Sequence, residues 1–285
     1  MFKSFTYFFF LSATLLLNPS TLNAQANQDE VPQVIVPAYP HTSSQPSMML
    51  PSSSSDMIQA EVKSDPLDSP HPIPWNWVLE TNESLQQKET SGVNYYRSSS
   101  LISPDGIYAA YSRIQMEGKP ELFRSRVTSV MFLENLHTGD LKTITASSPL
   151  ADNPFNSNEE ATRPGTISIL IPVSWSDSGD RVLARQFEGF FNTSYASDYA
   201  VVWERRNNRT VTVAPQNDLY TNAVLLGWSE TDPEQVLFRA GNLGEENWPL
   251  WAVDIEGETM LAGEDKPIVY GQVIKKVWTG PQARW

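Results

Sequence analysis

The stretch VSWSDSGDRVLARQF, residues 173–187, decides the fold because it recurs along the chain. In this copy a short polar turn, residues 177–180, separates an apolar approach from an apolar exit. LISPDGIYAAYSRI begins at Leu101 and LGWSETDPEQVLFRA begins at Leu226. A serine precedes the turn in each copy: Ser103, Ser176 and Ser229. Turn residues of this kind reverse the chain sharply, since Gly tolerates positive φ and Asp bonds its own backbone.

The repeated unit extends beyond this hairpin. Each copy is followed by two more strand-like runs, for example DYAVVWERRNN and RTVTVAP after the second copy. The apolar side chains of ISILIPVSW, residues 167–175, alternate strictly, which is typical of a strand. Continuous runs such as AVLL and YAVVW are typical of strands buried on both faces. We therefore expect units of four strands whose sheets stack, with Trp175 and Trp228 packed between them.

The sequence thus predicts an all-β fold, a propeller-like array of three four-stranded sheets. Three sheets do not close a ring, because propellers have about four to eight blades. We expect a fourth sheet built from the two ends of the folded region, in which WNWVLE (75–80) pairs with IVYGQVI and KKVWTG (268–280). The alternatives are an open half-ring completed by a second chain or a partner, and a β-sandwich.

The repeats resemble a known family. The W-S-x-x-G turn at Trp175, the run Asp254–Gly257 in WAVDIEGE and, more loosely, Asn135–Gly139 are similar to the blades of TolB-type β-propellers, relatives of the WD40 family. The resemblance covers about residues 98–265 and implies a propeller surface for protein contacts. It departs from the family in number, since those domains have six blades.

The chain as a whole also resembles a family of exported cyanobacterial proteins. The stretches that carry this resemblance are SRVTSVMFLENL, GNLGEENWPLW and the tail VWTGPQARW. It implies export and supplies no catalytic residue.

The N-terminus predicts export as well. Residues 1–26 combine Lys3, an apolar run from Phe5 to Leu17 and a small-residue cleavage site at 24–26, the pattern of a signal peptide. The apolar run is shorter than the roughly 20 residues of a membrane span. We expect a periplasmic or extracellular protein with no transmembrane segment after cleavage; an uncleaved anchor is the alternative.

Residues 27–74 are predicted to be a disordered tether. Nine Pro and nine Ser fall between Pro32 and Pro74, and such composition buries too little apolar surface to offset chain entropy. The alternative is a docking segment anchored by VPQVIVPAYP and SMML. All nine Trp and all 14 Gly lie beyond Pro74, so residues 75–285 are the predicted propeller-like domain.

Composition excludes several classes of function. With 33 acidic against 20 basic residues, the chain lacks the basic excess of a nucleic-acid or anionic-lipid binder. The absence of Cys excludes disulfides, thiolate catalysis and iron–sulfur clusters. His41 and His71 fall in the tether and His137 in a turn, and GWSET (227–231) lacks the second Gly of a nucleophile elbow. No phosphate loop or metal motif occurs. We expect no cofactor and no enzymatic activity.

One loop is the predicted contact site. RAGNLGEENWPLWAVD brings together Asn242, Glu245, Glu246 and Trp248, and carboxylates beside an exposed indole suit a sugar or a peptide. The alternative is that Trp248 packs back onto Trp251. Overall, the sequence favours a non-catalytic binding or scaffold protein of the periplasm or cell envelope, with envelope proteins as partners. The alternatives are a carbohydrate-binding or glycan-acting protein that uses these carboxylates, and a subunit completed by another protein.

Overall fold

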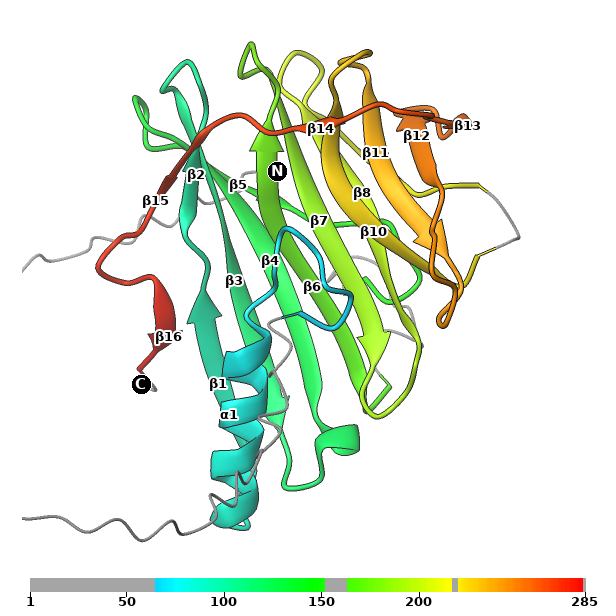
Figure 1. The fold of residues 1–285 in the computed structure, drawn as a ribbon. Helices are drawn as coiled ribbons and strands as arrows, with labels where there is room; N and C mark the ends of the chain where they lie inside the picture. The colour runs from blue at the N-terminus through cyan, green and yellow to red at the C-terminus, as the bar shows by residue number, and fades with distance from the viewer. Residues whose placement is uncertain (1–64, 152–162, 217–219, 284–285) are drawn as a thin grey trace, which may run out of the picture. The chain divides into compact units, whose positions relative to one another are not determined.

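The computed structural model describes residues 65–151, 163–216 and 220–283 (Figure 1). These residues lie within one structural unit, residues 59–285. The predicted signal peptide and residues 27–64 of the predicted tether lie outside the described residues. Within the described ranges the fold is all-β, as predicted, with one α-helix, α1 (Trp75–Gln87), and a short 3₁₀ turn, η1 (Leu122–Arg124).

Three antiparallel meanders of four strands coincide with the three sequence repeats. Meander 1 consists of β2 (Ser100–Ile102), β3 (Tyr108–Gly118), β4 (Arg126–Asn135) and β5 (Leu141–Ile144). Meander 2 consists of β6 (Thr166–Trp175), β7 (Arg181–Phe190), β8 (Ala196–Glu204) and β9 (Arg209–Val213). Meander 3 consists of β10 (Asn222–Ser229), β11 (Gln235–Gly241), β12 (Leu250–Asp254) and β13 (Thr259–Leu261).

The meanders belong to two sheets. A single parallel bridge, Val127 with Ile167, joins β4 to β6 and merges meanders 1 and 2 into one 11-stranded sheet. β1 (Gly92–Arg97) extends this sheet by pairing with β3. Meander 3 forms a separate five-stranded sheet with β14 (Pro267–Ile268). Neither sheet closes into a barrel within the described residues.

The hydroxyl of each turn serine accepts a backbone N–H of its own turn. The hydroxyl of Ser103 accepts the backbone N–H of Tyr108 at 2.9 Å, and the hydroxyl of Ser176 accepts that of Arg181 at 3.0 Å. Gly179 in the second turn has a φ of +73°, a conformation that favours glycine. In the third turn the hydroxyl of Ser229 accepts the N–H of Asp232 at 2.8 Å. One side-chain device therefore starts all three meanders.

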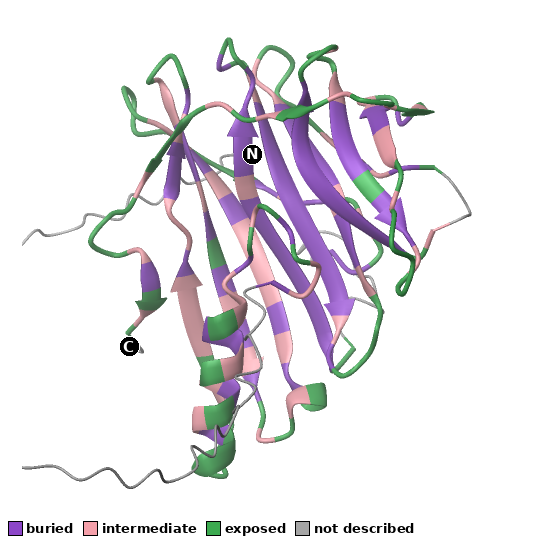
Figure 2. Ribbon diagram, in the orientation of Figure 1, coloured by how far each residue is buried: buried purple, intermediate pink, exposed green. Residues whose placement is uncertain are grey.

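The meanders stack through both faces of meander 2. Val182 and Ala184 on β7 pack into a core shared with meander 1, whereas Leu183 between them packs against meander 3. Trp175 lies in the first of these cores and Trp228 in the second, as expected for tryptophans between sheets. Figure 2 shows that β7 and β10 are buried over nearly their whole length. The continuous apolar runs of the sequence reflect this burial from two sides.

The predicted fourth sheet does not form, because WNWVLE belongs to helix α1. Trp77, Val78 and Leu85 are its buried apolar residues, and their spacing places them on one helical face. The six-residue run read alone fits a strand equally well, and only the polar continuation TNESLQQ gives it a helical length. The propeller-like closure predicted from this strand is therefore corrected.

The C-terminal tail pairs with the start of the folded region through other partners. β15 (Gln272–Ile274) pairs with β2, and β16 (Gly280–Gln282) pairs with β1. Upstream, β14 pairs with β10, and Tyr270 forms a bridge with Trp175. The tail thus contacts the first strand of each meander in turn, and Figure 1 shows it crossing all three in red. It ties the three meanders together.

The folded unit begins earlier than residue 75. Residues 65–74, which we call the strap, lie at the C-terminal end of the predicted tether and pack against the sheets; Asp65, Ser69 and Ile73 are buried. The carboxylate of Asp65 accepts the backbone N–H groups of Leu67, Ser69 and Ile73 at 3.0, 3.3 and 3.0 Å. One side chain therefore fixes the path of the strap.

A buried ionic network anchors the strap to meanders 2 and 3. Arg185 on β7 donates from Nη1 and Nη2 to the two oxygens of Asp65 at 2.7 and 3.1 Å. Its Nε lies 2.8 Å from Oδ1 of Asp198 on β8, and all three side chains are fully buried. Asp198 in turn accepts the backbone N–H of Leu225 on β10 at 3.0 Å. A single guanidinium thus links three parts of the structure.

We predict that Arg185→Met lowers the free energy of unfolding by about 3–5 kcal/mol, because it leaves two buried carboxylates without their cation. Urea unfolding followed by tryptophan fluorescence measures this change. Arg124→Met is the matched control, because Arg124 pairs with Glu121 on the surface, where the two side chains are 62% and 50% exposed. This variant should change the free energy of unfolding by less than about 0.5 kcal/mol. Similar losses in both variants would contradict the anchoring role of Arg185.

Candidate functional site

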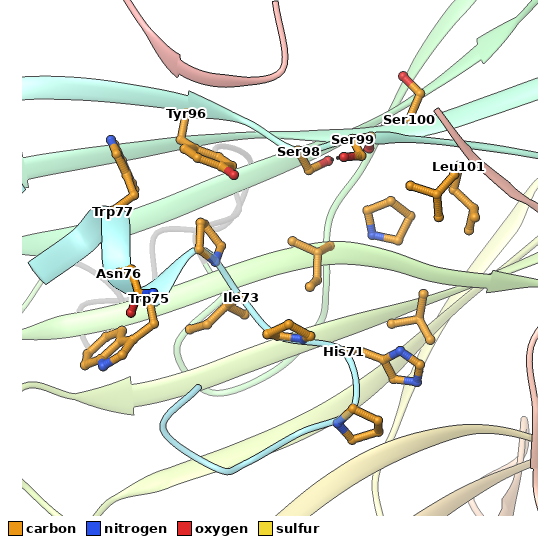
Figure 3. A pocket seen from close by; sticks show the side chains of 17 residues that line it. His71, Ile73, Trp75, Asn76, Trp77, Tyr96, Ser98, Ser99, Ser100 and Leu101 are labelled. Carbon is orange, nitrogen blue, oxygen red and sulfur yellow. Dashed lines mark hydrogen bonds between the residues drawn. The ribbon is translucent and has the colours of Figure 1, made fainter. Parts of the chain in front are cut away.

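A cavity of about 580 Å³ lies beside the strap (Figure 3). One wall consists of residues 70–77, from the strap and the first turn of α1. The opposite wall consists of Tyr96 and residues 98–101, where β1 leads into β2. Residues 171–173 of β6 and Val273 of β15 complete the lining. Pro70, Pro72, Asn76 and Val273 are exposed, so the cavity opens to solvent. Its volume is within the usual range for ligand sites.

The sequence of the strap explains its wall. Prolines at 70, 72 and 74 fix φ near −65° and remove backbone donors, which favours extended chain. The residues between them, His71 and Ile73, are followed by Trp75 and Trp77 at the same spacing. Ile73 and Trp77 are buried, and they join the core cluster formed by β3, β4 and β6. The wall is therefore rigid and apolar.

The β6 wall is irregular for an identifiable reason. A β-bulge falls between Pro172 and Ser174, where the register with β7 shifts. On its other side β6 is bridged to the described strands and tail only at Ile167 and at Trp175. Pro172 stands in this stretch and has no N–H to offer, a feature that discourages addition of a further strand. The wall therefore suits side chains of a ligand better than its backbone.

Few polar groups of the lining are free for a ligand. The Ser98 hydroxyl accepts the N–H of Ser112 at 2.8 Å, and the Ser100 hydroxyl accepts from Nη2 of Arg97 at 3.1 Å. The hydroxyls of Ser99 and Tyr96 have no such bond among the described residues, and burial raises the pKa of Tyr96. The lining holds no Asp, Glu, Lys or Arg. It can bury an apolar group and offer two hydroxyls and the side-chain amide of Asn76, and it holds no acid–base pair.

His71 belongs to the strap and is held in a neutral form. Its Nε2 lies 2.9 Å from the carbonyl oxygen of Leu226, and because a carbonyl can only accept, Nε2 carries the proton. Burial lowers the pKa of His71, and the nearby Arg185 charge lowers it further, although the bond to Leu226 opposes both. His71 therefore docks the strap on β10 as a neutral donor.

Hydrogen bonds within the loop hold the predicted contact loop, residues 242–248, in place. Glu245 accepts from the backbone N–H of Asn242 at 2.8 Å and from its side-chain amide at 3.0 Å. Trp248 donates from Nε1 to the carbonyl of Asn242 at 3.1 Å. These bonds lower the pKa of Glu245, which is fully exposed. The structure brings Asn242, Glu245 and Trp248 together, while Glu246 stands exposed beside them.

Trp248 packs back onto the sheet, as in the alternative, but on the face opposite to Trp251. Its ring lies against a cluster that contains Leu226 and Leu237, whereas Trp251 packs on the other face of meander 3. A Cβ on Gly241 would meet the indole at 2.5 Å, which shows how close the ring lies to the backbone. None of the four loop residues lines the cavity beside the strap. Their role in contacts stays a prediction.

Sequence reasoning missed the strap wall because it assigned residues 65–74 to the tether. A signal was present: P-H-P-I-P-W-N-W, residues 70–77, places apolar or aromatic residues at every second position of an extended stretch. Such alternation is typical of chain that lies on an apolar surface. The high proline content of residues 65–74 favoured the tether prediction over this signal.

The chain matches no protein-family model, and no curated protein is found as its relative. In the described ranges, no helix has the length and apolar character needed to cross a membrane. Nor do three or more His, Asp or Glu side chains of these ranges converge as metal ligands would.

We predict that the His71 imidazole titrates below 6.5, the ordinary value for histidine, because burial disfavours its charged form. The neutral ring stabilises the folded state above pH 6.5. This stabilisation is lost as the pH falls and the ring takes up a proton. NMR titration of the ring protons measures the midpoint directly.

His71→Gln keeps a donor for the Leu226 carbonyl and removes the titration. The unfolding free energy of the natural chain, measured relative to this variant, should therefore decrease between pH 7 and pH 5. A midpoint at or above 6.5, or parallel pH profiles, would contradict the assignment.

Proposed function

We propose that this chain is a non-catalytic, exported binding protein of the periplasm or cell envelope. In this proposal it holds an apolar segment of a partner protein in the cavity beside the strap. The observation that carries the proposal is the cavity itself: it is open and uncharged, and it is lined by proline, tryptophan and aliphatic side chains. The signal-peptide pattern of residues 1–26 supports export.

The fold offers a rigid frame for such binding. We propose that the three meanders are propeller-like blades. Their four-strand order and the packing of meander 2 between its neighbours support this interpretation. The resemblance to TolB-type blades supports it too, whereas two packed sheets also fit the β-sandwich alternative. Under either description the first strands β2 and β6 line the cavity, so its walls belong to regular structure rather than to loops alone.

The chemistry of the lining favours side-chain burial over catalysis. With no carboxylate and one histidine already bonded to a carbonyl, the wall supplies no paired acid and base. A cavity of this size accepts two or three apolar side chains, each worth about 1.5–3 kcal/mol on burial. Association offsets part of that sum, so we expect dissociation constants in roughly the micromolar range. Such affinity suits reversible contact with another envelope protein.

The test is selection of peptides from a random display library on the purified mature protein. We expect enriched peptides to share aliphatic or aromatic residues and to quench the fluorescence of the tryptophans in the cavity wall. Ser99→Phe fills the cavity from a position whose hydroxyl has no described hydrogen bond, and it should weaken peptide binding at least tenfold.

Ser91→Phe makes the same change at an exposed position outside the cavity and should leave binding unchanged. Both variants should unfold at the temperature of the natural protein within a few degrees. Peptides that bind the two variants equally, or a library that yields no enrichment, would contradict the proposal.

A further inference from the structure

A second cavity, of about 620 Å³, lies between the turns of meanders 2 and 3. Its lining comes from the turn that follows β6, from Arg181 at the start of β7, from Glu204 at the end of β8 and the next turn, from the end of β10 and the turn after it, and from Ile268 and Tyr270 of the tail. None of its residues lines the cavity beside the strap. Unlike that cavity, it is rich in charged and polar side chains. It is independent of the proposed function.

Trp228 in this lining carries a polar group without a partner. Its side chain is buried, with 2% exposed, and its Nε1–H has no acceptor among the described residues. Trp175 occupies the equivalent place in meander 2, one residue before the turn serine, and its Nε1 donates to the carbonyl of Leu101 at 3.1 Å. Buried N–H groups are rarely left unpaired, because the lost hydrogen bond to water is not replaced. The two repeats therefore differ at this N–H. Trp251 carries the other buried indole N–H of the described residues that lacks an acceptor, and it does not line this cavity.

Some lining groups are already occupied within the protein. Arg181 donates to Glu234 at 2.8 Å and to the carbonyl of Pro233 at 2.9 Å, and its guanidinium lies 5.0 Å from the centre of the Trp228 ring. Asp180 accepts from the hydroxyl of Ser176 at 2.8 Å. These contacts hold the walls in place and leave other groups to meet a ligand.

The free groups include both acceptors and donors. The carboxylates of Asp177, Glu204 and Glu230 make no ion pair or side-chain hydrogen bond in the part of the chain described. The same holds for the donors of Arg206 and Asn207, which face the same cavity. Arg205, next along the chain, bonds instead to Asp105 of meander 1 at 2.9 Å. The cavity therefore presents three carboxylates against one free guanidinium and one amide, and Trp228 lies in its wall.

This mixture limits the ligand. An anion would meet an excess of carboxylates, and a simple polyamine would leave the Arg206 and Asn207 donors unmatched. A hydroxyl group both donates and accepts, so a ligand with several hydroxyls satisfies both sets. The half-buried ring of Tyr270 adds an aromatic surface at the wall, on which a sugar ring can pack. We propose that this cavity binds a sugar or the end of a glycan.

The test uses the full mature protein, glucose, galactose and N-acetylglucosamine as probes, and NMR of the indole N–H groups. The Trp228 and Trp175 signals are assigned by their loss in Trp228→Phe and Trp175→Phe. At least one sugar should shift the Trp228 signal at millimolar concentration and leave the Trp175 signal in place. No shift with any sugar, or a larger shift with spermidine or phosphate, would overturn the proposal.

Substitutions separate this cavity from the loop predicted by sequence. Trp228→Phe and Glu230→Gln should each weaken sugar binding about tenfold, the effect of one hydrogen bond. Glu246→Gln removes an exposed carboxylate of the 242–248 loop and should leave affinity unchanged. Loss of binding in Glu246→Gln alone would place the glycan site on the loop and overturn the proposal. Ser99→Phe, which blocks the other cavity, should have no effect here, so the two proposals can fail separately.

A stability comparison checks the unpaired N–H without any ligand. Trp228→Phe and Trp175→Phe remove the same atoms from equivalent positions, but only Trp175 loses a hydrogen bond, the one to the Leu101 carbonyl. Trp175→Phe should therefore lower the melting temperature more than Trp228→Phe. Equal losses would show that the Trp228 N–H is satisfied in the free protein and would remove the main support for the site.

Discussion

The ion pairs of the Arg185 guanidinium with Asp65 and Asp198 are the interaction on which the described structure depends. It is fully buried between Asp65 of the strap and Asp198 of β8, and such charges are tolerated inside a protein only when they are paired and hydrogen-bonded. Burial raises the pKa of Asp198 to about 6, against the attraction of Arg185. Burial also acts to raise the pKa of Asp65, but Arg185 and the backbone N–H groups of the strap outweigh it and lower that pKa. Asp65 accepts from Nη1 and Nη2 of Arg185 and from three backbone N–H groups, and it belongs to the strap.

This network explains how the apolar cavity gets its wall. The strap carries few apolar residues, and its prolines donate no backbone hydrogen bonds. Asp65 supplies the anchoring that apolar contacts do not. Its carboxylate accepts from Arg185 and from three backbone N–H groups of the strap. His71 adds a bond to β10. With the strap fixed in this way, Ile73 and Trp77 reach the core and the prolines face the cavity. The polar cavity depends instead on the turns, which Arg181 holds together.

The sequence predicted the parts of the fold that are encoded locally. The four-strand units, the serine turns and the buried positions of Trp175 and Trp228 follow from periodicity and turn chemistry over a few residues. The sequence could not show that WNWVLE is a helix, since six residues fit both periods. Nor could it place Arg185, which stands in a strand pattern and finds Asp65 120 residues away. The polar cavity was missed for the same reason, because its walls come from turns far apart in the chain.

Hydrogen–deuterium exchange in the Asp65→Asn variant tests the central claim most directly. If Asp65 anchors the strap, the amides of Leu67, Ser69 and Ile73 and those of the first turn of α1 will lose much more protection than the amides of β7 and β8 that pair with each other. The same protection in the variant and the natural protein would contradict the account. A loss in the strap no larger than the loss in β7 and β8 would contradict it as well, because the strap would then open only when the whole fold unfolds.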